Sequence, residues 1–232
     1  MLPTLFSLIL AQANEDCTLD FVLFEDVSIA QAQVLKKYGA SCQDAVNLET
    51  KAQDIYGKAT DAVAAGNTKL AKQYLTDLEN NYRSTQTWTA ASRLKNEVEV
   101  VGLQVNKYTN VDWIQGYDDI RSGTVLLVFW EVWCPHCKRE LPKLQQLHEQ
   151  YQHKGLKVVG LTKMNRSSTP EKISEFIRKN NIQYPIGKED GQMTAMFAVT
   201  GVPAAAIIHN GRVVWRGHPA NIDSNILGSY LQ

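Results

Sequence analysis

Two cysteines separated by a dipeptide are the residues of this 232-residue chain best suited to chemistry. Cys134 and Cys137 enclose Pro135 and His136. A thiolate at the first position can attack a substrate disulfide and form a mixed disulfide, which the thiol one helical turn later resolves. The spacing therefore predicts thiol–disulfide exchange, with Cys134 as the nucleophile and Cys137 as the resolving cysteine.

The residues around this motif predict a strand before it and a helix after it. Residues 125–130 are apolar throughout, as in a strand buried on both faces, and residues 138–152 have helical period. Cys134 then lies at a helix N-terminus, where free backbone N–H groups and the helix dipole stabilise a thiolate. We expect Cys134 to be the more exposed thiol, and a cationic His136 to stabilise its thiolate further.

A metal site is one competing interpretation of the cysteine pair. Structural zinc usually needs a second pair or histidines at fixed spacing. His148 and His153 have a nominal zinc-finger spacing, but a rise of ~1.5 Å per residue puts His148 about 16 Å from Cys137 along the helix. We therefore expect no metal and no dissociable cofactor. A purely structural disulfide between the two cysteines is a further alternative.

The first half of the sequence predicts helices. Apolar residues recur at three- and four-residue steps over 45–63, 70–82 and 88–101, with breaks at 66–67 and 83–85, and another helix is predicted over 29–38. Such short breaks favour antiparallel neighbours. Part of this region resembles a tetratricopeptide-type helix pair, which would offer a groove for a protein partner. A plain helical bundle is the alternative.

The N-terminus suggests export. An apolar run over residues 2–11 is followed by Ala11-Gln12-Ala13, the small-x-small pattern of a signal-peptidase site. We expect residues 1–13 to be a signal peptide and the mature chain to be periplasmic, without membrane contact, because no later apolar run approaches ~20 residues. A buried N-terminal helix is the alternative.

The other two cysteines could form a structural disulfide in an oxidising compartment. Cys17 and Cys42 flank the predicted helix over 29–38. Their bond would close a loop of about 26 residues and stabilise the helical region by about 3.5 kcal/mol in the chain-entropy model. Two free buried thiols are the alternative.

Composition limits the partners. Lys and Arg number 24, as do Asp and Glu, so the chain has no net charge and no basic surface for nucleic acid is expected. A hydrophobic share of 44% with 21% charged residues is that of a globular protein and argues against disorder.

The second half carries a series of landmarks in a recognisable order. They are the cysteine motif within residues 129–142, a strand over 157–161, a capped helix from Ser168, the segment Gly201-Val202-Pro203, and a hairpin over 204–216. Together they resemble the thioredoxin superfamily, and more narrowly the exported TlpA/ResA-type thiol–disulfide oxidoreductases. The resemblance covers roughly residues 100–232. It implies an α/β thioredoxin-like domain at 108–232, preceded by a helical domain at 14–107.

The resemblance also implies roles for four residues beside the cysteines. Pro203 should follow a cis peptide bond and so set the backbone of Val202 to pair with a substrate peptide; an ordinary trans turn proline is the alternative. Glu140 would lie near the cysteines and tune their protonation, unless it is a solvated helix carboxylate. Trp133 would shield the sulfurs, with core packing as the alternative.

Two positions depart from the family. Many thioredoxins have a buried aspartate where this chain has Val128. Glu131 could replace that proton acceptor, or strand alternation could point it at solvent. The Pro135-His136 dipeptide is like that of DsbA-type oxidases, whereas the other landmarks resemble reductases, so both directions of exchange stay open.

The sequence thus predicts an enzyme that exchanges disulfides with protein substrates and is recharged by an upstream redox partner. One alternative is a partner-binding helical module with an accessory thioredoxin domain. Another is a peroxiredoxin-like peroxidase, although Glu131 occupies the place of the threonine in the Thr-x-x-Cys context that such enzymes need.

Overall fold

The computed structural model of the chain describes residues 42–105 and 111–231. Two compact units divide between Lys95 and Asn96, within helix α5 (Thr87–Val100). The expected signal peptide, the helix over 29–38 and Cys17 lie outside the described residues. Cys42 begins helix α3, but its side chain lies outside them too.

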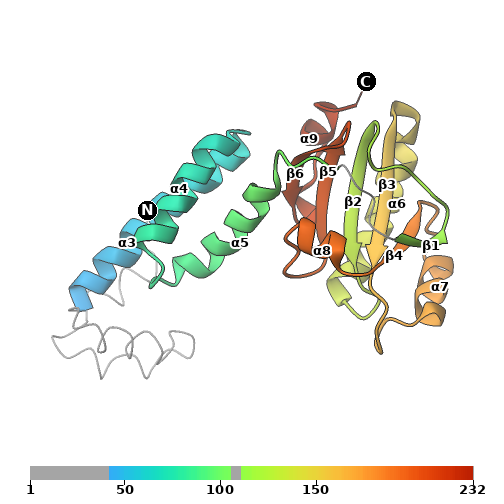
Figure 1. Cartoon of the computed structure of the whole chain (residues 1–232), viewed down its shortest axis with the longest axis horizontal. Helices are drawn as coiled ribbons and strands as arrows, with labels where there is room; N and C mark the ends of the chain where they lie inside the picture. The colour runs from blue at the N-terminus through green and yellow to red at the C-terminus, as the bar shows by residue number, and fades with distance from the viewer. Residues whose placement is uncertain (1–41, 106–110, 232) are drawn as a thin grey trace, which may run out of the picture. The chain divides into compact units, whose positions relative to one another are not determined.

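The first unit is helical, as its periodicity predicted. Helix α3 (Cys42–Ala64) and helix α4 (Thr68–Asn81) pack against each other (Figure 1). Alanines close the contact at Ala52, Ala59 and Ala71, which are fully buried. The predicted break between the two helices is real, because the side chain of Asn67 accepts the backbone N–H of Leu70 and so caps α4.

A buried carboxylate holds the start of α5 against α3. One oxygen of Glu49 accepts the backbone N–H of Gln86 at 2.8 Å, and the other accepts the backbone N–H and the hydroxyl of Thr87 at 3.0 and 2.6 Å. Unpaired N–H groups and the dipole make a helix N-terminus a favourable place for a negative charge. Glu49 therefore fastens α5 although it lies far away in sequence.

The second unit is built on a six-stranded sheet in the order β1-β4-β3-β2-β5-β6. The strands are β1 (Val111–Gln115), β2 (Thr124–Trp130), β3 (Leu156–Thr162), β4 (Ile186–Glu189), β5 (Ala204–His209) and β6 (Arg212–Gly217). β2, β3 and β4 run parallel, while β1, β5 and β6 pair antiparallel with their neighbours. The turn between β5 and β6 is the Asn210-Gly211 pair, both at positive φ, as the sequence predicted.

Helices cover both faces of this sheet (Figure 1). They are α6 (Pro135–Tyr151), α7 (Pro170–Lys179) and α9 (Ser224–Gly228) on one face and α8 (Gln192–Met196) on the other, with short 3₁₀ turns η2 (Gln152–Lys154) and η3 (Pro219–Asn221). All seven residues of β2 are buried, and the six from Val125 to Trp130 alternate between the two cores. The sheet is therefore the thioredoxin-like α/β layer that the resemblance implied. No helix among the described residues is long and apolar enough to cross a membrane.

We predict that Glu49→Ala destabilises the helical unit by about 1–3 kcal/mol, because it leaves the buried N–H groups of Gln86 and Thr87 without their acceptor. Urea unfolding followed by helical circular dichroism measures this loss. Asp61→Ala, an exposed carboxylate on the same helix, is the control and should be nearly neutral. Equal losses in the two variants would contradict the role given to Glu49.

Candidate functional site

The buried strand β2 ends where the cysteine motif begins. Cys134 is the N-cap of α6, with φ −78° and ψ 116°, and Pro135 occupies the first turn, where its missing N–H costs nothing. The backbone N–H of Cys137 donates to Cys134 Sγ at 3.3 Å. The helix N-terminus therefore points a donor at the first sulfur, which is the arrangement that favours a thiolate there.

Both thiols are free and buried, at 3% exposure for Cys134 and 0% for Cys137. The sequence led us to expect Cys134 to be the more exposed of the two thiols, and it is, although the loop before β5 covers its sulfur almost completely. The two thiols also differ in protonation. Burial, and next the hydrogen bond with Cys134, raise the pKa of the Cys137 thiol well above its ordinary value.

The covering loop presents its backbone to the nucleophile. The Val202–Pro203 bond is cis, as the resemblance implied. The Val202 carbonyl oxygen accepts from Cys134 Sγ at 3.4 Å. Within the described residues the Val202 N–H has no hydrogen-bond partner. This short segment can therefore offer a backbone donor to a substrate beside the reacting sulfur.

Arg216 clamps both ends of that loop, and the sequence analysis did not single it out. Its Nε donates to the carbonyl of Phe197 at 3.0 Å and its Nη1 to that of Ala205 at 3.3 Å. The side chain is buried, and burial lowers the pKa of the guanidinium. By bonding to residues at both ends of the loop, Arg216 holds the Val202 backbone next to Cys134.

Glu131 is neither a partner of the thiols nor a fully solvated carboxylate. Its Oε2 accepts three hydrogen bonds, from Trp133 Nε1 at 2.8 Å, Asn165 Nδ2 at 2.9 Å and Ser168 Oγ at 2.7 Å. Trp133 is 51% exposed, so it is not a core residue. Glu131 therefore fixes the orientation of an exposed indole and ties it to the loop between β3 and α7.

His136 has a cationic neighbour on the same helix. It is exposed, and its Nδ1 lies 2.6 Å from Arg139 Nη2. A guanidinium can only donate, so Nδ1 is the acceptor in this contact. Arg139, which sequence reasoning did not consider, therefore places a cation beside His136.

Glu140 lies near the start of α6, close to a second histidine, His218. It is buried at 8% exposure, so it is not a solvated carboxylate, and it accepts from Lys143 Nζ at 2.9 Å. Burial lowers the pKa of His218, while the negative charge of Glu140 acts in the opposite direction. His218 directly follows β6, and no sequence motif indicated that it lies near Glu140.

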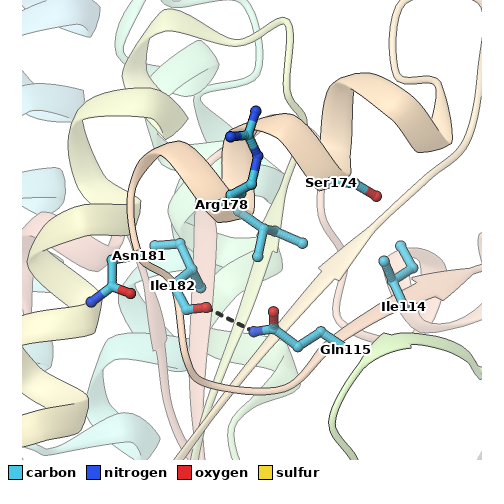
Figure 2. A pocket seen from close by; sticks show the side chains of 7 residues that line it. Ile114, Gln115, Ser174, Arg178, Asn181 and Ile182 are labelled. Atoms are coloured by element: carbon cyan, nitrogen blue, oxygen red, sulfur yellow. Dashed lines mark hydrogen bonds between the residues drawn. The ribbon is translucent and has the colours of Figure 1, made fainter.

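Two of the cavities among the described residues of this unit have different surroundings. One of about 250 Å³ lies beside the cysteine motif, between Glu131, Trp133 and Val202. The other, of about 360 Å³, lies between β1 and α7 and shares no lining residue with the first. Figure 2 shows the Gln115 amide beside that second cavity, hydrogen-bonded to the carbonyl of Ile182. The part of the chain that the structure describes holds no group of three metal-ligating side chains.

Comparison with known proteins gives a consistent result for this unit. Residues 109–216 match the AhpC/TSA family. The thiol-disulfide oxidoreductase ResA of Bacillus thuringiensis (strain Al Hakam) is 26% identical over 98 residues, which cover 41% of this chain and 55% of ResA. The sporulation thiol-disulfide oxidoreductase A of Bacillus subtilis is 26% identical over 90 residues, covering 38% and 54%.

The chain thus spans about half the length of the curated relatives that it matches. Among solved structures, a thiol:disulfide interchange protein of the thioredoxin family from Chlorobium tepidum TLS is 18% identical, with a TM-score of 0.46 over 56% of this chain and 96% of that one. The family match and the sheet with its cis-proline loop agree: residues 109–216 are similar to the AhpC/TSA family and have a thioredoxin-like fold.

Proposed function

We propose that the chain is a thiol–disulfide oxidoreductase that acts on protein substrates through Cys134 and Cys137. One observation carries the proposal. Cys134 Sγ caps a helix, accepts the N–H of Cys137, and lies 3.4 Å from the carbonyl oxygen of Val202, whose N–H is available to a substrate. The names of the curated relatives support the same activity.

The exchange proceeds in two displacements at sulfur. The Cys134 thiolate attacks one sulfur of a substrate disulfide, the substrate S–S bond breaks, and the departing thiolate takes up a proton. Cys137, once deprotonated, attacks Cys134 Sγ and releases the second substrate thiolate. The substrate has gained two electrons and the enzyme holds a Cys134–Cys137 disulfide. The reverse sequence oxidises a substrate dithiol.

Neighbouring groups prepare these steps without reacting themselves. The backbone N–H of Val202 would pair with the substrate chain, so that its disulfide lies in line with Cys134. Pro135 opens the helix, and Glu140, buried on the same helix three residues after Cys137, would tune the protonation of the pair. Because burial raises the pKa of Cys137, the resolving thiol keeps its proton until the mixed disulfide has formed.

The cellular setting is part of the proposal and rests on the sequence. A signal peptide over residues 1–13 would deliver the chain to the periplasm, where Cys17 and Cys42 could pair and an upstream redox partner could recharge Cys134 and Cys137. The helical domain at 14–107 would serve as a tetratricopeptide-like surface for a protein partner. The domain at 108–232 would carry the exchange.

We predict that Cys137→Ser accumulates a covalent mixed disulfide with a disulfide-containing protein such as insulin, because Cys134 can attack but the complex cannot be resolved. Non-reducing electrophoresis and mass spectrometry measure the adduct. Cys134→Ser should form none at this motif, and the double variant measures adducts at Cys17 and Cys42. Equal trapping by Cys134→Ser would reverse the roles of the two cysteines.

We also predict that the resolving step accelerates with pH. A thiol whose pKa is raised is deprotonated only at higher pH, so its reactive fraction grows about tenfold per pH unit between pH 6 and 8. Stopped-flow reaction with dithiobis(nitrobenzoate) releases one thionitrobenzoate when Cys134 attacks and a second when Cys137 resolves. The second phase, identified by its absence in Cys137→Ser, should show this slope, and a pH-independent second phase would contradict it.

A further inference from the structure

The cavity of about 250 Å³ is lined by Trp133, the residue immediately before the nucleophile. Val202 lines it, and the carbonyl of the same residue accepts from Cys134 Sγ. The half-exposed indole of Trp133 lines the cavity too. A substrate chain held at Val202 with its sulfur at Cys134 would therefore bring a neighbouring side chain to this cavity.

Glu131 gives the cavity an unbalanced negative charge. All three of its hydrogen bonds come from neutral donors and reach only Oε2. In the part of the chain that the structure describes, Oε1 has no hydrogen bond and no cation pairs with the carboxylate. The other two charges of the lining, Lys163 and Glu189, lie 3.8 Å apart and offset each other.

Trp133 adds a second feature that selects for a cation. Its bond to Glu131 holds the ring in one orientation while half of the side chain stays in solvent. A cation over an indole face gains about 0.5–1 kcal/mol at an exposed site. The free carboxylate oxygen beside the ring would add a charge-assisted hydrogen bond.

We infer that this cavity binds the side chain of a lysine or arginine adjacent to the reactive cysteine of a substrate polypeptide. The inference rests on the proposed function and specifies its substrates. An acidic side chain would face the charge of Glu131. An apolar one would cover that charge without neutralising it, which costs free energy. A basic side chain alone neutralises Glu131 and contacts the indole.

Synthetic peptides that differ at one position test this preference. Each carries a single cysteine linked to thionitrobenzoate, with lysine, norleucine or glutamate next to it. Cys134 takes the peptide sulfur into a mixed disulfide and thionitrobenzoate leaves as the coloured thiolate. The rate constant for each peptide is divided by its rate constant with dithiothreitol, which removes differences in intrinsic reactivity.

The lysine peptide should react about tenfold faster than the norleucine peptide, with the glutamate peptide slowest, and 0.5 M salt should reduce the difference. Glu131→Gln should abolish the preference while keeping the fluorescence of Trp133, because the amide oxygen can accept the same donors. Glu175→Gln makes the same change in net charge on the exposed face of α7 and should keep the preference.

Equal normalised rates for the lysine and norleucine peptides in the wild-type chain would overturn the inference, and so would a preference that survives Glu131→Gln or is insensitive to salt. The salt series uses the wild-type chain alone, so it decides the matter even if a variant fails to fold. Failure of the proposed function looks different: no peptide would then react faster with the wild type than with Cys134→Ser.

Discussion

Burial of strand β2 on both faces is the constraint on which the rest of the catalytic unit depends. Its seven residues are enclosed by helices on one side and by α8 and the end of α5 on the other, so the strand cannot shift without exposing one of two cores. The chain leaves this fixed strand at Trp130 and enters α6 at Pro135. The short connection between them therefore holds Cys134 at a helix N-terminus, and both cysteines pack in the same core as one face of the strand.

The charges around the cysteines are distributed unevenly. Arg139 bonds His136, Lys143 bonds Glu140, and Lys163 lies near Glu189. Glu131 is different, since its partners are an indole, an amide and a hydroxyl. Hydrogen bonds of this kind position a carboxylate without neutralising it. The negative charge of Glu131 therefore acts on a substrate that approaches Cys134. The interior by contrast contains a protonated thiol, because burial raises the pKa of Cys137.

The helical unit is stabilised in a different way from the sheet unit. Its helices approach through small buried residues such as Ala52, Ala59 and Ala71, and one long-range set of hydrogen bonds from Glu49 fastens the third helix. Small side chains allow close helix contact but bury little apolar area per residue. The hydrogen bonds of Glu49 add to this packing a connection between α3 and the start of α5.

Local patterns in the sequence were sufficient for much of this protein. A continuous apolar run predicts a doubly buried strand, three- and four-residue steps predict helices, and Asn210-Gly211 predicts a hairpin, because each of these signals depends only on neighbours along the chain. The same holds for the pair Cys134 and Cys137, one helical turn apart. The order of the landmarks was enough to identify a thioredoxin-like domain. The polar strand β4 carried no such signal and was missed.

Only the tertiary structure decided how the site is covered and charged. The burial of Cys134 depends on a loop some seventy residues later, the place of Glu131 depends on Asn165 and Ser168, and the partner of His136 depends on which face of α6 bears Arg139. Each of these is set by folding that brings distant or differently oriented groups within hydrogen-bond distance. The sequence by itself determined which residues could react and on which elements they lie, whereas their exposure, protonation and partners follow from contacts that no local pattern encodes.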